Sequence, residues 1–261
     1  MRTRILTALV GIPLVLAAVF IAGPAVYGLV VLLVALVALH EYLGLCGVEP
    51  PLAAVFLASE AVLLASIPFG HAPAVAAAAL PVLALVSLWR AGDPARRFRG
   101  VAEGFFGLAY IGYGMGCLWL LRESVPVGPA WVFLVLAATW AGDSAAYFAG
   151  SRFGRRRFAP TLSPNKTWAG AIGGLAGSLA GGCLAAPLFA GAVSLPVAAG
   201  VGLAVGVAGQ LGDLFESLWK RAKGVKDSGR IIPGHGGLLD RIDSLLLGIP
   251  AGYHLVRALA P

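Results

Sequence analysis

Long apolar runs, separated by short polar or Pro- and Gly-containing breaks, dominate the pattern of this chain. A helix that crosses a bilayer needs about 20 mostly apolar residues, whereas a membrane β-barrel shows short segments of alternating apolar and polar residues. We therefore predict an all-α polytopic membrane protein with about nine transmembrane helices. The predicted spans are 5–22, 24–40, 51–69, 72–89, 104–121, 129–149, 168–187, 193–212 and 244–260.

The first run follows Arg2 and Arg4 and could be mistaken for a signal peptide. It is longer than the usual apolar core of a signal, and further runs follow at once, so we interpret it as a retained first helix. The pattern divides the chain into an N-terminal part, 1–100, with about four spans and a C-terminal catalytic part, 101–261, with about five. The polar stretches 150–167 and 213–243 are predicted to be cytoplasmic loops of the second part.

Composition and charge agree with this interpretation. The chain is 59% hydrophobic and only 12% charged, whereas soluble domains average about 25% charged residues. If the N-terminus is cytoplasmic and the C-terminus is outside, 17 of the 19 Lys and Arg residues fall in cytoplasmic segments, and only Arg122 and Arg257 fall outside. Positive residues are retained in this way on the cytoplasmic side. The net charge of +7 therefore marks topology and suits anionic lipid headgroups, and nucleic acid is not an expected partner.

The seventh run contains the sequence GAIGGLAGSLAGG, in which small residues recur every four positions. Gly173, Gly177 and Gly181 form one such series. Small residues at this spacing let helix backbones approach closely. We interpret the series as a helix-packing surface, either within one chain or between two.

Polar chemistry begins at the sixth run. Asp143 lies inside this apolar segment, where a carboxylate is costly and marks a functional site unless it pairs with a basic residue of another helix. The following turn contains Ser163, Lys166 and Thr167 and leads into the Gly-rich helix. Hydroxyls, an ammonium group and free backbone N–H groups at such a turn can bind a phosphate.

A second polar segment ends the eighth run. Asp213 and Ser217 are four residues apart and share a helix face, which Lys220 continues. Glu216 and Lys220 have the same spacing, so they can also form an ion pair at a wet helix end.

A third polar segment precedes the last run. Gly236 and Gly237 allow the backbone to approach a ligand closely, and Asp240 and Asp243 follow on one helix face. Several carboxylates beside an anionic substrate require a divalent cation, and Mg²⁺ takes one or two carboxylates together with phosphate oxygens and water. Because the site flanks membrane spans, the sequence indicates phosphoryl or nucleotidyl transfer with a lipid as one reactant.

The stretch SLWKRAKGVKDSGRIIPGHGGLLDRIDS, residues 217–244, resembles the C-terminal signature of the phosphatidate cytidylyltransferase (CDP-diacylglycerol synthase) family. The turn 163–168, SPNKTW, resembles the Ser-Pro-Lys-Lys-Thr turn of that family, with Asn165 in place of one lysine. The pattern of Asp143, Tyr147 and Gly150 is similar as well. The matched positions in the C-terminal stretch are Ser217, Lys220, Arg221, Lys226, Asp227, Pro233, His235, Gly236, Gly237, Asp240, Arg241 and Asp243.

This resemblance implies transfer of a cytidylyl group from CTP to phosphatidic acid, giving CDP-diacylglycerol and pyrophosphate. It also implies Mg²⁺, with room for a second, monovalent ion such as K⁺, and a homodimer in the bacterial inner membrane with its active site facing the cytoplasm. The implied metal ligands are Asp213 and Asp240, followed by Asp243 and Asp143. The implied catalytic residues are Lys220, Arg221, Lys226, Asp227, His235 and Arg241, and the implied substrate-binding residues are Ser163, Lys166, Thr167, Ser217, Gly236 and Gly237.

Some alternatives remain open at this point. His235 could act as a general base or only as a hydrogen-bond donor within its loop. A membrane alcohol phosphotransferase would need an Asp-Gly-x-x-Ala-Arg element, which the chain lacks. A transporter could use Asp143 and Glu60 as ion sites within the membrane, but it would have little need for Lys, Arg, Gly and Asp gathered at one face.

Overall fold

The computed structural model describes residues 2–88, 93–232, 234 and 236–259. Over these residues the chain forms nine α-helices, two short 3₁₀ turns and one β-hairpin. The helices are α1 (Arg2–Phe20), α2 (Pro24–Cys46), α3 (Pro50–Ser66), α4 (Ala72–Leu88), α5 (Pro94–Glu123), α6 (Gly128–Phe153), α7 (Trp168–Ala185), α8 (Leu195–Ala222) and α9 (Leu239–Leu259). The 3₁₀ turns η1 (Ile67–Phe69) and η2 (Ala186–Phe189) follow α3 and α7. Proline begins α2, α3 and α5, where its fixed φ suits the first helical position.

Six segments among the described residues are long and apolar enough to cross a membrane. They are Pro24–Cys46, Pro50–Phe69, Pro94–Glu123, Gly128–Phe153, Trp168–Phe189 and Leu195–Ala222. The helices α1 and α4 contribute shorter apolar stretches, Leu9–Phe20 and Ala72–Val86. The prediction of a helical, multi-pass membrane protein is therefore confirmed, and the count of nine crossings stays a prediction.

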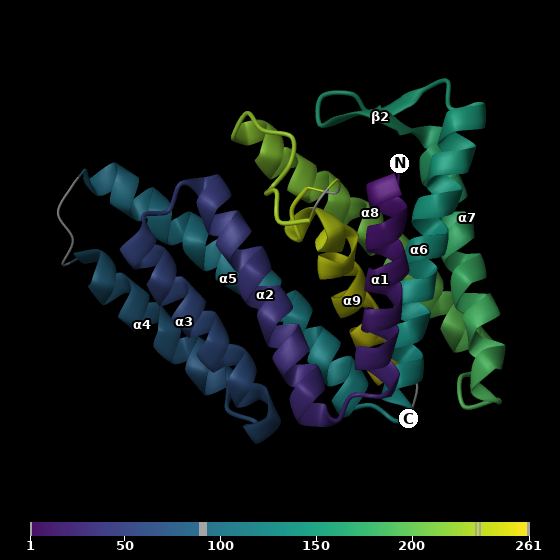
Figure 1. Ribbon diagram of the computed structural model, residues 1–261, viewed down its shortest axis with the longest axis horizontal. Helices are drawn as coiled ribbons and strands as arrows, with labels where there is room; N and C mark the ends of the chain where they lie inside the picture. The colour runs from purple at the N-terminus through teal and green to yellow at the C-terminus, as the bar shows by residue number, and fades with distance from the viewer. Residues whose placement is uncertain (1, 89–92, 233, 235, 260–261) are drawn as a thin grey trace.

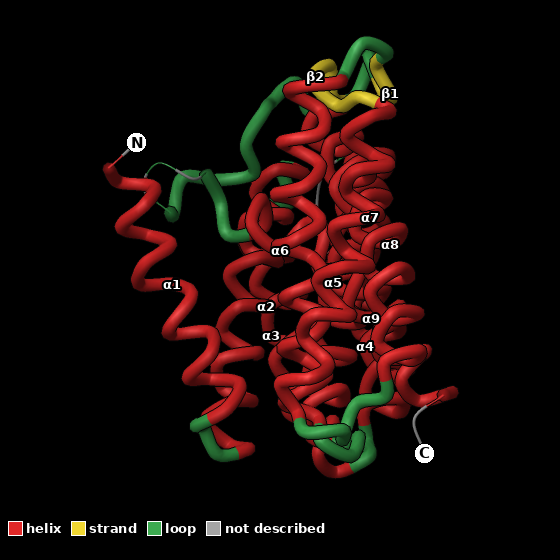
Figure 2. Tube along the Cα trace, turned by 90° about the vertical axis from the view of Figure 1, so that its right-hand side faces the viewer, coloured by secondary structure: helices red, strands yellow, loops and turns green. Residues whose placement is uncertain are grey.

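The helices form one elongated bundle with the two chain termini at opposite ends (Figures 1 and 2). The helices α3 and α4 lie on one side of the bundle, α6 and α7 lie on the other, and α2, α5, α8 and α9 lie between them (Figure 1). The N-terminus, the β-hairpin and the loop between α8 and α9 share one end (Figures 1 and 2). Most of the basic segments named above therefore gather at this end.

Helix α5 joins the two predicted parts of the chain. The expected division near residue 100 falls inside α5, which packs against α2 and α3 of the first part and α9 of the second. Lys223, just after α8, donates to Glu103 of α5 at 2.7 Å. The N-terminal helices are thus packed against the elements that carry the polar segments.

The only sheet in the described part of the chain is a hairpin of β1 (Arg157–Ala159) and β2 (Ser163–Thr167). The strands pair antiparallel, with Arg157 opposite Thr167 and Ala159 opposite Ser163. The sequence predicted only a polar turn here. The hairpin leads directly into α7, because Thr167 caps that helix by accepting a hydrogen bond at Oγ1 from the backbone N–H of Gly170 at 3.1 Å.

The small residues of α7 pack the helix against neighbours of the same chain. A Cβ added to Gly177 would overlap Ala145 of α6 and lie 2.7 Å from the carbonyl oxygen of Ala141. On the adjacent face of α7, a Cβ on Gly182 would lie 2.7 Å from the carbonyl oxygen of Ala198 in α8. The helix-packing interpretation of this run is confirmed, and the contacts lie within one chain.

We expect Gly177→Leu to lower the midpoint of thermal unfolding in detergent. The added side chain has no space between α6 and α7, and overpacking of this kind costs about 1–3 kcal/mol. Gly200→Leu on α8 is the matched control, since a Cβ there meets its nearest neighbour, Leu255, at an ordinary 3.6 Å. Equal midpoints for the two variants would contradict the close α6–α7 contact.

Candidate active site

A cavity of about 710 Å³ lies among α6, α7, α8, α9 and the strand β2. Its wall combines acidic, basic, hydroxyl and amide side chains in a bundle that is otherwise largely apolar. The polar and charged residues of the wall are Asp143, Tyr147, Ser151, Asn165, Lys166, Thr167, Gln210, Asp213, Asp240, Arg241, Asp243 and Ser244. All four acids predicted as metal ligands border this one cavity, together with the predicted Lys166, Thr167 and Arg241.

Three helices bring the acids together. Asp143 comes from α6, Asp213 from α8 and Asp243 from the first turns of α9. Glycine allows the last two helices to meet at this level, because a Cβ on Gly212 would lie 2.6 Å from the carbonyl oxygen of Asp243. Asp213 can therefore lie beside Asp243 because the residue before it, Gly212, has no side chain.

Lys166 supplies positive charge within reach of the acids. Its Nζ lies 2.7 Å from Oδ2 of Asp213, and the two side chains retain 27% and 35% of their exposure. Solvent screens a pair this exposed, so a phosphate can compete for the ammonium group. The cavity thus contains carboxylates together with an ammonium group that can leave Asp213 and bind a phosphate.

Asp240 borders the cavity, but its two oxygens are bound by the protein. Oδ1 accepts a hydrogen bond from Lys220 at 2.7 Å. Oδ2 accepts from the backbone N–H groups of Ser228 and Gly237 and from the Ser228 hydroxyl, all at 2.9 Å. Burial opposes ionisation, but these hydrogen bonds outweigh it and hold the pKa of Asp240 below its usual value. This geometry makes Asp240 an organiser of the loop between α8 and α9, and its role as a metal ligand stays a prediction.

Lys220 lies behind the cavity wall in a buried ion-pair network. Its Nζ donates to Asp240 and, at 3.1 Å, to Oε1 of Glu216. The spacing of Glu216 and Lys220 correctly predicted an ion pair, but both residues are buried and not at a wet helix end. The ammonium group of Lys220 therefore contacts two buried acids, and its implied catalytic role stays a prediction.

Several other predicted residues lie outside the described cavity wall. Arg221 donates to the carbonyl oxygens of Leu162 and Val225, which ties the hairpin to the end of α8. Ser217 is buried on α8, and Ser163 is half-buried in β2. Lys226 and Asp227 are exposed. None of these five predicted residues is among the described residues of the cavity wall.

The two glycines give the loop room to close. Gly236 has φ 82, and a Cβ there would lie 2.9 Å from Oδ2 of Asp240. A Cβ on Gly237 would overlap the Ser228 hydroxyl. Their predicted role in substrate binding stays a prediction, and His235 and Pro233 lie outside the described residues.

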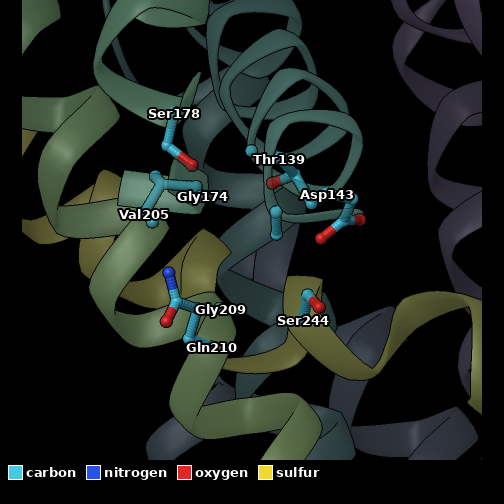
Figure 3. Close-up of a pocket in the computed structure, with 11 residues that line it drawn as sticks. Thr139, Asp143, Gly174, Ser178, Val205, Gly209, Gln210 and Ser244 are labelled. Atoms are coloured by element: carbon cyan, nitrogen blue, oxygen red, sulfur yellow. The ribbon is translucent and has the colours of Figure 1, made fainter. Parts of the chain in front are cut away.

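A smaller pocket of about 30 Å³ adjoins the cavity and extends it into the bundle. Figure 3 shows Asp143 from α6 and Ser244 from α9 facing one another at this pocket, with Gln210 of α8 nearby. Sequence reasoning did not select Gln210 or Ser244. The sequence offered one signal for them: Gln210 lies on the same helix as Asp213, and Ser244 directly follows Asp243.

The acidic residues fit a divalent cation in part. The described residues contain no group of three or more His, Cys, Asp or Glu side chains gathered closely enough to hold a metal by themselves. Mg²⁺ needs only one or two carboxylates when phosphate oxygens and water complete its shell. Asp243 precedes the predicted span 244–260, and burial together with the neighbouring Asp213 raises its pKa above the usual value. A cation shared with substrate phosphates would relieve this repulsion.

Comparison with known proteins identifies a family and several relatives of this chain. A profile described as the "Cytidylyltransferase family" matches residues 2–259. A phosphatidate cytidylyltransferase of Pseudomonas aeruginosa is 37% identical over 268 residues, covering 99% of this chain and 97% of that protein. Proteins of the same name from Brucella suis biovar 1 and Thermotoga maritima are 46% identical over 164 residues and 39% identical over 176 residues. These two matches cover 62% and 64% of this chain, but only 57% and 63% of the relatives. Because the profile spans almost the whole sequence, this chain belongs to the cytidylyltransferase family.

Proposed function

We propose that this protein is a membrane phosphatidate cytidylyltransferase, which converts CTP and phosphatidic acid into CDP-diacylglycerol and pyrophosphate. The observation that carries the proposal is the single cavity bordered by Asp143, Asp213, Asp243, Lys166 and Arg241 at one end of a membrane helix bundle. A charged cavity at that position can receive a water-soluble nucleotide and the headgroup of a lipid whose chains remain in the bilayer. The names of the relatives support the same reaction.

The reaction requires positioning and charge stabilisation more than proton transfer. A phosphate oxygen of phosphatidic acid is already anionic and attacks the α-phosphorus of CTP. The new P–O bond forms as the bond to the β-phosphate breaks, and pyrophosphate leaves with that electron pair. Lys166 and Arg241 border the space in which these phosphates would meet, and cations at such positions stabilise transferring phosphoryl groups.

Asp213 and Asp243, together with Asp143, would hold Mg²⁺ beside the substrates. When bound, the metal supplies positive charge against the phosphates of CTP. Asp240 contributes by fixing the loop that leads into α9. A second, monovalent ion stays a prediction.

We also propose that the cavity faces the cytoplasm and that the protein lies in the bacterial inner membrane. The shared end of the N-terminus, the hairpin and the α8–α9 loop (Figure 2), together with the positive-inside pattern, supports this orientation. A crossing count of nine would then leave the C-terminus outside. The homodimer rests on family resemblance alone and is testable by chemical cross-linking in membranes.

The purified protein should release pyrophosphate from CTP only when phosphatidic acid is present. Diacylglycerol with the same acyl chains is the matched control, since it lacks the phosphate that attacks CTP. A second arm follows label from radioactive CTP into a chloroform-soluble product, which distinguishes CDP-diacylglycerol formation from simple hydrolysis. Pyrophosphate release that ignores phosphatidic acid, or labelled lipid formed equally from diacylglycerol, would contradict the proposal.

A further inference from the structure

Glu41 is a buried acid of the N-terminal half that reaches the start of α9. It lies near the end of α2 and is only 6% exposed. Its Oε2 accepts a hydrogen bond from the backbone N–H of Leu239 at 2.8 Å and a longer one from the Ser228 hydroxyl at 3.4 Å. Leu239 is the first residue of α9, so a side chain from α2 binds one of the N–H groups that a helix leaves free at its N-terminus.

The α8–α9 loop closes tightly around this carboxylate. Cβ atoms added to Gly229 and Gly237 would lie against it, and all three nearest atoms to the one on Gly229 belong to Glu41. Oε1 of Glu41 is buried and has no hydrogen-bond partner among the described residues. A buried acceptor without a partner lowers stability, which argues against a role for Glu41 in folding alone.

The contact leads directly to the cavity. Glu41 holds the N–H of Leu239, and Asp240, the next residue, holds the other side of the same loop. Arg241 and Asp243 follow within the first turns of α9 and border the cavity. Glu41 thus contacts both the loop and the first N–H group of the helix that carries these two residues.

We propose that Glu41 is a positioning residue for cytidylyl transfer, which couples α2 to the cavity residues Arg241 and Asp243. The inference rests on the proposed function for its kinetic test. Glu41 is not part of the described cavity wall, so it acts through the N-terminus of α9.

The first test compares substitutions at Glu41. We expect Glu41→Ala to lower kcat about tenfold or more, the size of effect that follows loss of one hydrogen bond to a charged group. Glu41→Gln keeps the length and one oxygen acceptor, so it should stay within about threefold of the wild type. Glu60→Gln is the control, since Glu60 is also buried but packs against Gly112 of α5, away from the loop. Equal losses in the Ala and Gln variants, or full activity in Glu41→Ala, would overturn the proposal.

The second test uses the close contact of Gly229. Gly229→Ala alone should lower kcat, because the added methyl group collides with Glu41. Gly229→Ala should add no further loss to Glu41→Ala, and the shorter Glu41→Asp should partly rescue it, since contacting residues are not additive. Gly44→Ala is the control for a glycine-to-alanine substitution. Gly44 lies on α2 with Glu41, and a Cβ there has no neighbouring atom within 4 Å. Additive losses would show that Glu41 and the loop act independently.

The third test does not depend on activity. Amide hydrogen exchange should accelerate at residues 228–232 and 236–241 in Glu41→Ala while α6 and α7 keep wild-type protection. If Glu41→Ala fails to fold, the Gly229→Ala and Glu41→Asp pair provides the same comparison. Unchanged exchange at residues 228–232 and 236–241 would overturn the positioning role. If exchange accelerates locally in Glu41→Ala but the wild-type protein shows no cytidylyl transfer, the contact is real and the proposed function is wrong.

Discussion

Asp243→Asn and Asp213→Asn should each lower kcat for cytidylyl transfer by about a hundredfold or more, the range seen when one preorganised electrostatic group is removed from a transition state. Asparagine keeps the shape of the side chain and removes its charge. At Asp243 it also keeps an oxygen that can accept the 2.6 Å hydrogen bond from the backbone N–H of Ser244. The loss should therefore reflect the missing carboxylate, and initial rates of labelled lipid formation measure it.

Asp93→Asn is the matched control for these variants. Asp93 caps α5 by accepting from the N–H of Arg96 at 2.9 Å, and asparagine caps helices equally well. It should leave kcat unchanged. Near-normal turnover in both Asp213→Asn and Asp243→Asn would remove the metal assignment and with it the account of the cavity.

The sequence predicted the helices well because bilayer helices are specified locally. Continuous apolar length requires no knowledge of neighbouring segments, and the position of basic residues orders the loops. The hairpin at 157–167 was missed because its pairing depends on how Arg157 and Thr167 meet across a turn. Helix α8 continues to Ala222, beyond the predicted span, since other helices bury the polar residues at its end.

The sequence predicted part of the cavity wall, and the roles of these residues stay predictions. Motif resemblance gathered Asp143, Asp213, Asp240 and Asp243, and the structure brings them to one cavity. Spacing along the chain could pair Lys220 with Glu216, but not with Asp240, twenty residues away. Contacts between distant segments decide whether a charged residue faces substrate or protein.

Glu41 was missed for the same reason. It follows directly after the predicted span 24–40, where an acid usually marks only the membrane surface. Its partner, Leu239, is 198 residues later and offers a backbone N–H, which leaves no trace in the pattern of side chains.

Lys220→Met should destabilise the protein by about 3–5 kcal/mol, the cost of removing one partner from a buried charge network. Methionine fills a similar volume but leaves the carboxylates of Glu216 and Asp240 buried without their shared cation. Thermal unfolding of the purified protein in detergent measures the effect as a lower midpoint. Glu216→Gln added to Lys220→Met should recover part of the loss, because it replaces one of the two carboxyl groups left without that cation.

Lys166→Met is the comparison that separates the two lysines. Its partner Asp213 is partly exposed, and exposed pairs contribute only about 0–1 kcal/mol, so the unfolding midpoint should stay close to wild type while the KM for CTP rises. If Lys220→Met instead unfolds at the wild-type temperature and raises the KM for CTP, Lys220 holds a substrate phosphate, which fits the catalytic role that the motif resemblance implied. The buried network of Lys220, Glu216 and Asp240 would then rearrange when the nucleotide binds. In the geometry described, the ammonium group cannot bind the phosphate while it contacts both acids.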